Sequence, residues 1–86
     1  MGEPREIRIK RLAMRSMRRG IKEMDVILSA FAEARLGALD DNTLSDYERL
    51  LNENDHDLYA WVSGTQPVPE QFEPLISAIK ANLPRI

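Results

Sequence analysis

The chain has 86 residues, a formal net charge of −2, no cysteine and a single histidine. That length is enough for one small domain, and without cysteine neither disulfides nor a thiolate metal site can hold it together. The lone His56 also excludes a histidine cluster for zinc, and no acidic loop suited to a hard cation is present. We therefore expect a single domain over residues 1–86, stabilised by a hydrophobic core, with no metal site.

The charges are unevenly distributed. Residues 1–22 contain eight Lys/Arg and two Glu, a net of +6, and residues 23–86 contain four basic and twelve acidic residues, a net of −8. The apolar stretches are far shorter than the roughly 20 residues that span a bilayer, and no apolar segment typical of a signal peptide follows the charged start. Glu3 and Glu6 argue against a mitochondrial transit peptide. We expect a cytoplasmic protein without membrane insertion.

The first predicted helix covers residues 5–19, because apolar residues recur there at the helical spacing of three and four. Its expected core contacts are Ile9, Leu12 and Met17, and Gly20 is expected to end it with a positive φ. Basic residues at the same spacing predict a basic face, formed by Arg11, Arg15, Arg18 and Lys22.

The second predicted helix covers residues 21–35 and ends before Gly37. Residues 40–43 are typical of a polar turn, and Ser45 with Glu48 three residues later predicts a capping box that starts the third helix. The apolar faces of these two helices should be buried; they consist of Met24, Ile27, Leu28, Phe31, Tyr47, Leu50 and Leu51.

The fourth predicted helix is short, is capped by Asp55 and ends at Gly64. Two prolines make residues 65–69 an extended connection to the fifth helix, which covers about residues 70–83 and stops at Pro84. The residues expected to face the core are Leu58, Trp61, Val62, Phe72, Leu75, Ile76, Ile79 and Leu83. The sequence thus predicts an all-α fold, a small five-helix bundle.

Nothing in the sequence predicts an active site. The only candidate base, His56, lies in a helix start, and the aspartates that surround it and the preceding turn are explained by capping and solubility. The glycines are isolated, without a phosphate-binding loop. We expect a binding protein, not an enzyme, with no catalytic residues.

Residues 18–25 contain the pattern R-G-x-x-E, at Arg19, Gly20 and Glu23, followed by Asp25. A Leu-Leu pair and an Asp-x-Asp-Leu-x-x-Trp block follow at residues 50–51 and 55–61. In these features the chain resembles the SdhE family of succinate dehydrogenase assembly factors over about residues 11–64. The C-terminal helix matches that family in pattern only.

The resemblance implies a chaperone that binds the flavoprotein subunit of succinate dehydrogenase or fumarate reductase and promotes its covalent flavinylation. FAD would be attached to the partner, and no tightly bound cofactor is expected on this chain. The partner-binding residues would be Arg19, Gly20 and Glu23, with Arg18 and Asp25 beside them. We expect Gly20→Arg and Glu23→Ala to abolish flavinylation while leaving stability nearly unchanged.

Two alternatives remain for particular residues. The basic face of Arg11, Arg15 and Lys22 could bind nucleic acid or make an antitoxin-like protein, although the acidic remainder of the chain would repel a duplex. Gly20 could also be only a helix cap that Arg19 and Glu23 flank. We adopt neither alternative, and we expect a monomer that binds no nucleic acid.

Overall fold

The computed structural model describes residues 3–83, which contain five α-helices, two 3-10 helices and no strand. The all-α, five-helix prediction is confirmed, and no helix among these residues combines the length and apolar character needed to cross a bilayer. The helices are α1 Arg5–Arg15, α2 Lys22–Arg35, α3 Asp41–Leu51, α4 Asp55–Ser63 and α5 Glu73–Ala81, and the 3-10 helices are Leu36–Ala38 and Glu70–Phe72.

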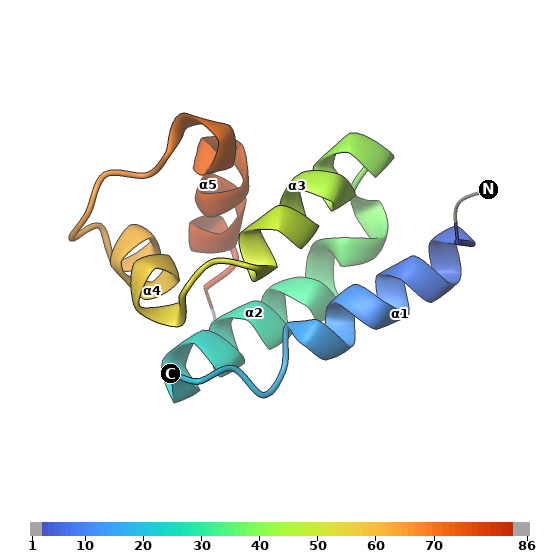
Figure 1. The fold of residues 1–86 in the computed structure, drawn as a ribbon, viewed down its shortest axis with the longest axis horizontal. Coiled ribbons are helices and arrows are strands. Elements are labelled where there is room, and N and C mark those ends of the chain that lie inside the picture. Colours follow the sequence, from blue (N-terminus) through green and yellow to red (C-terminus); the bar gives the residue numbers. More distant parts are fainter. Residues whose placement is uncertain (1–2, 84–86) are drawn as a thin grey trace.

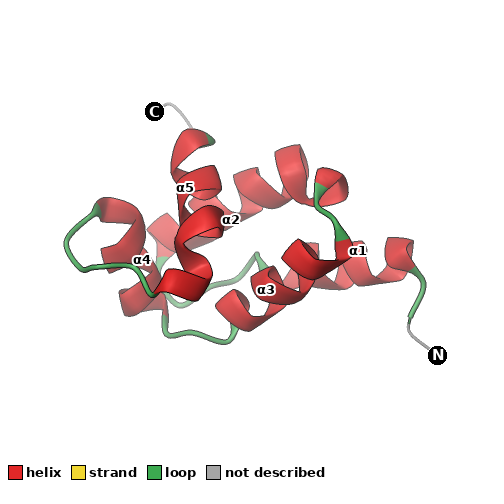
Figure 2. Cartoon of the chain, turned by 90° about the horizontal axis from the view of Figure 1, so that it is seen from above, coloured by secondary structure: helices red, strands yellow, loops and turns green. Residues whose placement is uncertain are grey.

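α2 is the central element, with contacts to α1, α4 and α5 (Figures 1 and 2). Its face of Met24, Leu28 and Phe31 is fully buried, as its apolar spacing predicted. α1 and α3 occupy one end of the molecule, and α4 and α5 occupy the other (Figure 1). The core is therefore continuous from one helix pair to the other.

Most of the predicted core residues are buried, including Leu12, Tyr47 and Trp61. Phe31 packs against Tyr47 with ring centroids 5.6 Å apart, and Trp61 packs against Phe72 at 5.8 Å. Two predictions are wrong: Met17 is 48% exposed because it lies beyond the end of α1, and Leu83 is 43% exposed because it follows the last turn of α5. Pro84 lies outside the described residues.

The starts of α3 and α4 differ from the predicted ones. α3 begins at Asp41 and not at Ser45, because Asp40 Oδ1 accepts a hydrogen bond from the Thr43 amide at 2.7 Å. Hydrogen bonding by Thr43, from its side chain and from its backbone amide, lowers the pKa of Asp40. For α4 the capping side chain belongs to Asn54, which accepts from the His56 amide at 2.8 Å, so Asp55 is free for other contacts.

Positive φ angles occur at one residue after α1 and at one residue after α4. α4 ends as predicted at Gly64, whose φ is 83°. α1 ends at Arg15, four residues earlier than predicted, and it is Arg18 and not Gly20 that has a positive φ, 56°. The prediction of Gly20 as a left-handed helix cap is therefore wrong, and Gly20 is needed for another reason.

Candidate functional site

The connection between α1 and α2, residues 16–21, carries the Arg-Gly of the predicted partner-binding pattern. Arg19 donates from Nε to Asp55 Oδ1 at 2.6 Å, and its two other nitrogens reach the carbonyl oxygens of Leu51 at 3.1 Å and Glu53 at 3.3 Å. The Arg19 side chain is only 12% exposed and that of Asp55 only 18%. The guanidinium that was expected to face a partner is thus directed into the protein, where it ties this connection to the turn before α4.

Gly20 is held by the same carboxylate. Its amide donates to Asp55 Oδ2 at 2.6 Å, and a Cβ built on Gly20 would lie 2.9 Å from that oxygen. A side chain at this position would therefore force the Asp55 carboxylate to shift. Because Arg19 also holds this carboxylate, we now expect Gly20→Arg to lower the stability as well as partner binding.

The other residues of the pattern lie in the first turns of α2. Glu23 and Lys22 are exposed, and Asp25, half-buried, accepts a hydrogen bond from Ser29 Oγ at 3.2 Å. Arg18 and Gly20 are exposed on the adjoining connection. The structure thus brings these predicted site residues together at one corner of the molecule, with Arg19 beneath the surface and the others at it.

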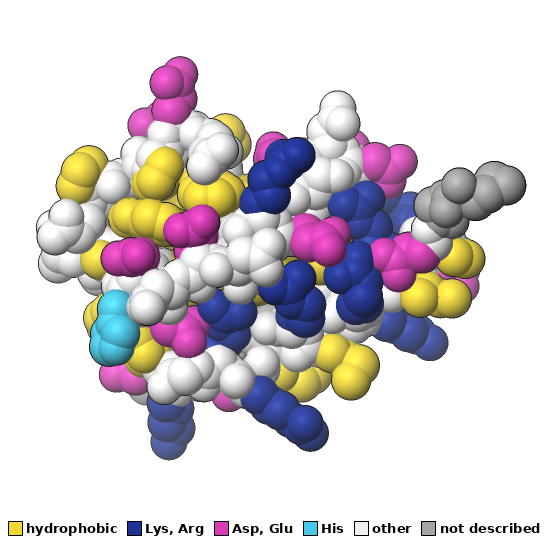
Figure 3. Space-filling model, viewed as in Figure 1, with side chains coloured by type: hydrophobic (Ala, Val, Ile, Leu, Met, Phe, Trp, Pro, Cys, Tyr) yellow, Lys and Arg dark blue, Asp and Glu magenta, His cyan; other side chains and the backbone are white. Residues whose placement is uncertain are grey.

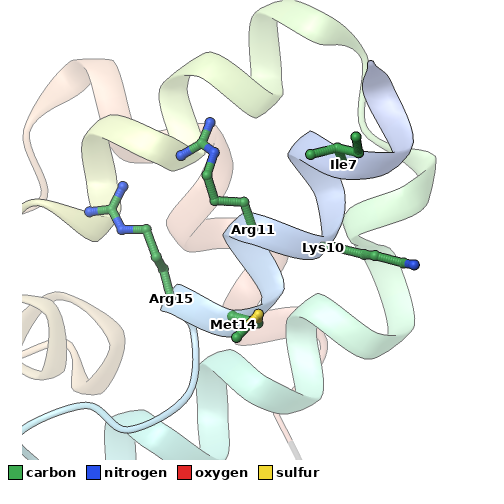
Figure 4. Close-up of a pocket in the computed structure, with 5 residues that line it drawn as sticks. All are labelled: Ile7, Lys10, Arg11, Met14 and Arg15. Carbon is green, nitrogen blue, oxygen red and sulfur yellow. The ribbon is translucent and has the colours of Figure 1, made fainter. Parts of the chain in front are cut away.

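The predicted basic face is not a single open row. Arg18 and Lys22 lie outside α1, and Arg11 and Arg15 extend from α1 toward α3 (Figure 4). Arg11 bonds Glu48 at 3.0 Å and Glu3 at 2.6 Å, and Arg15 donates to Asn52 Oδ1 at 2.6 Å. These contacts lower the pKa of Glu48 and of Glu3 and raise that of Arg11.

Two further arginines extend the same pattern. Arg5 bonds Asp41 at 3.0 Å, and Arg8 donates to Ser45 Oγ at 2.8 Å. We call the contacts of Arg5, Arg8, Arg11 and Arg15 with α3 and Asn52 the arginine seam; basic and acidic side chains mix along it (Figure 3). Each hydrogen-bonded pair of the seam is separated by 36 or 37 residues, so α1 and α3 run in the same direction with a nearly constant offset.

The outward side of α1 forms a shallow groove of about 450 Å³ (Figure 4). Ile7 and Met14 are its exposed apolar residues, 54% and 70% accessible, and Lys10 lies between them along the helix. The arginines that line it are already engaged by the seam, so the groove has no free polar cluster with which to orient a small ligand.

The described residues contain no group of three or more potential metal ligands. His56 is exposed at the start of α4. Asp55, the residue that unites the site, was missed as a site residue because a short-range pattern shows only its place at a helix start. Its pairing with Arg19, 36 residues away, has no local signal in the sequence.

Comparison with known proteins supports the resemblance. A family model described as the flavinator of succinate dehydrogenase matches residues 10–83. Among the similar curated proteins are those of Danio rerio, 42% identical over 74 residues, and Meyerozyma guilliermondii, 40% identical over 75 residues, each match covering 84% of this chain. Both are named "Succinate dehydrogenase assembly factor 2, mitochondrial", and the matches cover 47% and 56% of those proteins.

The same names correct one expectation. The relatives from Danio rerio, Meyerozyma guilliermondii and Drosophila grimshawi are all named as mitochondrial, which contradicts the prediction of a cytoplasmic protein. That prediction depended on the lack of an apolar segment and on Glu3 and Glu6 in the charged start. Several basic residues of this start form the arginine seam.

The chain spans about half the length of the curated relatives it matches. The family match nevertheless includes α2 to α5 and the R-G-x-x-E corner. Since the matched region covers nearly all the described helices, the chain belongs to the SdhE family, the flavinators of succinate dehydrogenase.

Proposed function

We propose that this chain is an assembly factor that binds the flavoprotein subunit of succinate dehydrogenase, or of fumarate reductase, and promotes covalent attachment of FAD to that subunit. The observation that carries the proposal is the match of residues 10–83 to the flavinator family, with the R-G-x-x-E pattern at a solvent-accessible corner. Glu23 at this corner can accept hydrogen bonds from donors on a partner.

In this proposal the chain acts by binding and not by catalysis. Among the described residues no hydroxyl is hydrogen-bonded to the imidazole of His56, which lies exposed at the start of α4. The chain would hold the flavoprotein in a conformation in which the flavoprotein's own groups complete the attachment. FAD would then remain on the partner, and the assembly factor would dissociate without a cofactor.

The test is covalent flavin fluorescence of the flavoprotein subunit, resolved on a denaturing gel, with and without this chain. Purified apo-flavoprotein, FAD and the chain should give a fluorescent band that is strongly reduced when the chain is omitted. Glu23→Ala should reduce the band to the level without the chain, because it removes an exposed acceptor at the corner.

The matched control is Glu33→Ala, which removes an exposed glutamate from the same helix but away from the corner. This variant should support flavinylation like the wild type, and both variants should keep the wild-type melting temperature. A flavin band of equal intensity with and without the chain would overturn the proposal.

A further inference from the structure

We propose that Asp55 is a positioning residue for partner binding: by holding Arg19 and Gly20 it fixes the connection that presents Glu23 to the partner. The proposal rests on the proposed function and deepens it. In this proposal, Arg19 and Gly20 of the R-G-x-x-E pattern make their hydrogen bonds within the protein, and Glu23 is available to another molecule.

The geometry at Asp55 is that of a two-point clamp. Oδ1 accepts from the Arg19 side chain and Oδ2 accepts from the Gly20 amide, both at 2.6 Å. Two bonds to adjacent residues fix the path of the backbone as well as the side chain, and bonds to charged groups are the short and strong ones. Asp55 can make both because Asn54, and not Asp55, caps α4.

Burial gives the clamp its strength. The Arg19 and Asp55 side chains are 12% and 18% exposed, so removing one of the pair leaves the other charge partly desolvated without its partner. Arg19 also bonds the carbonyl oxygens of Leu51 and Glu53, which join the end of α3 to this connection. The Arg19–Asp55 pair thus links three segments: residues 16–21, the end of α3 and the start of α4.

The clamp also explains why residue 20 is glycine. A Cβ at this position would approach Asp55 Oδ2 to 2.9 Å, and Gly20 has no positive φ that would require glycine for backbone reasons. The group that comes close to residue 20 and leaves little room for a side chain is therefore Asp55 of the same chain. α2 begins two residues later, so a displaced Gly20 would change the position of Lys22 and Glu23 at the start of that helix.

The experiment is a double-mutant cycle of Gly20→Ala and Asp55→Ala, read as affinity for the purified flavoprotein subunit by calorimetry. Measurements are made at a temperature where circular dichroism shows every variant to be folded. Because the added methyl group has nothing to displace once the carboxylate is gone, we expect Gly20→Ala to weaken binding about 10-fold or more in the wild-type background but less than about 2-fold in the Asp55→Ala background.

Asp55→Asn separates the two bonds, since its amide oxygen can still accept from Gly20 but it lacks the charge that pairs with Arg19. We expect its affinity to lie between those of the wild type and Asp55→Ala. A purely structural role would lower the melting temperature of the Asp55 variants while the folded fraction kept wild-type affinity, and that result would overturn the proposal.

Equal losses from Gly20→Ala in both backgrounds would also overturn it, because they would mean that the added methyl group meets the partner and not Asp55. Glu23→Ala distinguishes this failure from that of the proposed function. If Glu23→Ala abolishes binding and Asp55→Ala does not, only the positioning role fails; if the wild-type chain does not bind the flavoprotein, both fail.

Discussion

Ser16 and Tyr47 make a buried polar contact between the end of α1 and the middle of α3. Both residues are fully buried, their hydroxyl oxygens are 2.5 Å apart, and Ser16 Oγ also donates to the Leu12 carbonyl at 2.8 Å. Tyr47 is therefore the donor in the bond between the two hydroxyls. Burial raises the pKa of Tyr47 to about 12, so this donor stays protonated in neutral solution.

The two halves of this contact should contribute unequally to stability. Ser16→Ala leaves the Tyr47 hydroxyl buried without its partner, which costs about 1–3 kcal/mol, whereas Tyr47→Phe removes that hydroxyl and costs only about 0.5–1.5 kcal/mol. Urea unfolding of the two single variants and the double variant measures these losses of stability. The double variant should be no less stable than Ser16→Ala alone; additive losses would contradict this account.

The start of α3 depends on Asp40 and not on the predicted Ser45. Asp40→Ala should lower the free energy of unfolding by about 1 kcal/mol, because the Thr43 amide loses its acceptor. Ser45→Ala should have a smaller effect, since Ser45 lies inside the helix and donates to the Asp41 carbonyl at 3.1 Å. Thermal unfolding followed by circular dichroism compares the stability of the two variants. A larger loss of stability for Ser45→Ala would contradict the assignment of Asp40 as the cap of α3.

The helices themselves could be predicted better than their ends. The spacing of residues such as Leu28, Phe31 and Ile76 is a local property, and burial of an apolar stripe follows from it. The end at Gly64 is local as well, because positive φ is a property of one residue. The connection that follows α1 is held by contacts of Arg19 and Gly20 with the distant Asp55, so its path could not be predicted from nearby sequence.

The arginine seam makes the packing of α1 against α3 dependent on pH. Hydrogen bonds from Arg11 lower the pKa of Glu48 below its ordinary value of 4.5. A carboxyl group whose pKa is lower in the folded protein contributes stability above the unfolded value, and this contribution is lost as the pH falls through the folded value. The seam should therefore stabilise the protein at neutral pH and weaken below pH 4.5.

Glu48→Gln should lower the melting temperature by a few degrees at pH 7, and its difference from the wild type should shrink as the pH falls below 4.5. The matched control is Glu33→Gln, which changes an exposed glutamate on α2 outside the arginine seam. Melting curves from pH 7 to pH 3 measure both variants. A difference between Glu48→Gln and the wild type that grows as the pH falls would contradict the sign.

At the scale of the whole molecule, the opposite charges of the two parts of the chain neutralise one another within the fold. The sequence shows a net of +6 in residues 1–22 and −8 in the rest, and it suggested an open basic face. The parallel arrangement of α1 and α3 instead places acidic or polar groups beside Arg5, Arg8, Arg11 and Arg15. These pairings connect residues 36 or 37 positions apart, which helical spacing alone cannot reveal.

This arrangement predicts weak binding to duplex DNA. The seam arginines already face carboxylates or polar groups of α3, and the chain carries a net charge of −2, so few cations remain to neutralise phosphates. Fluorescence anisotropy with a labelled duplex in 150 mM salt should show no binding tighter than about 10⁻⁴ M, the weak end of non-specific binding by DNA-binding proteins. Micromolar binding by the wild type would contradict this prediction and favour the nucleic-acid alternative.

A pair of double variants tests whether the contacts of the seam, and not the net charge, are the cause of weak DNA binding. Asp41→Asn with Glu48→Gln removes two acids that contact the seam arginines, and Glu33→Gln with Glu73→Gln removes two exposed acids elsewhere, so both variants have the same formal charge. At low salt the first should bind DNA more tightly than the second, because it removes the negative charges beside Arg5, Arg8 and Arg11 on one side of α1. Equal binding by the two would mean that the arginines are no more available in the first variant, and that net charge alone limits DNA binding.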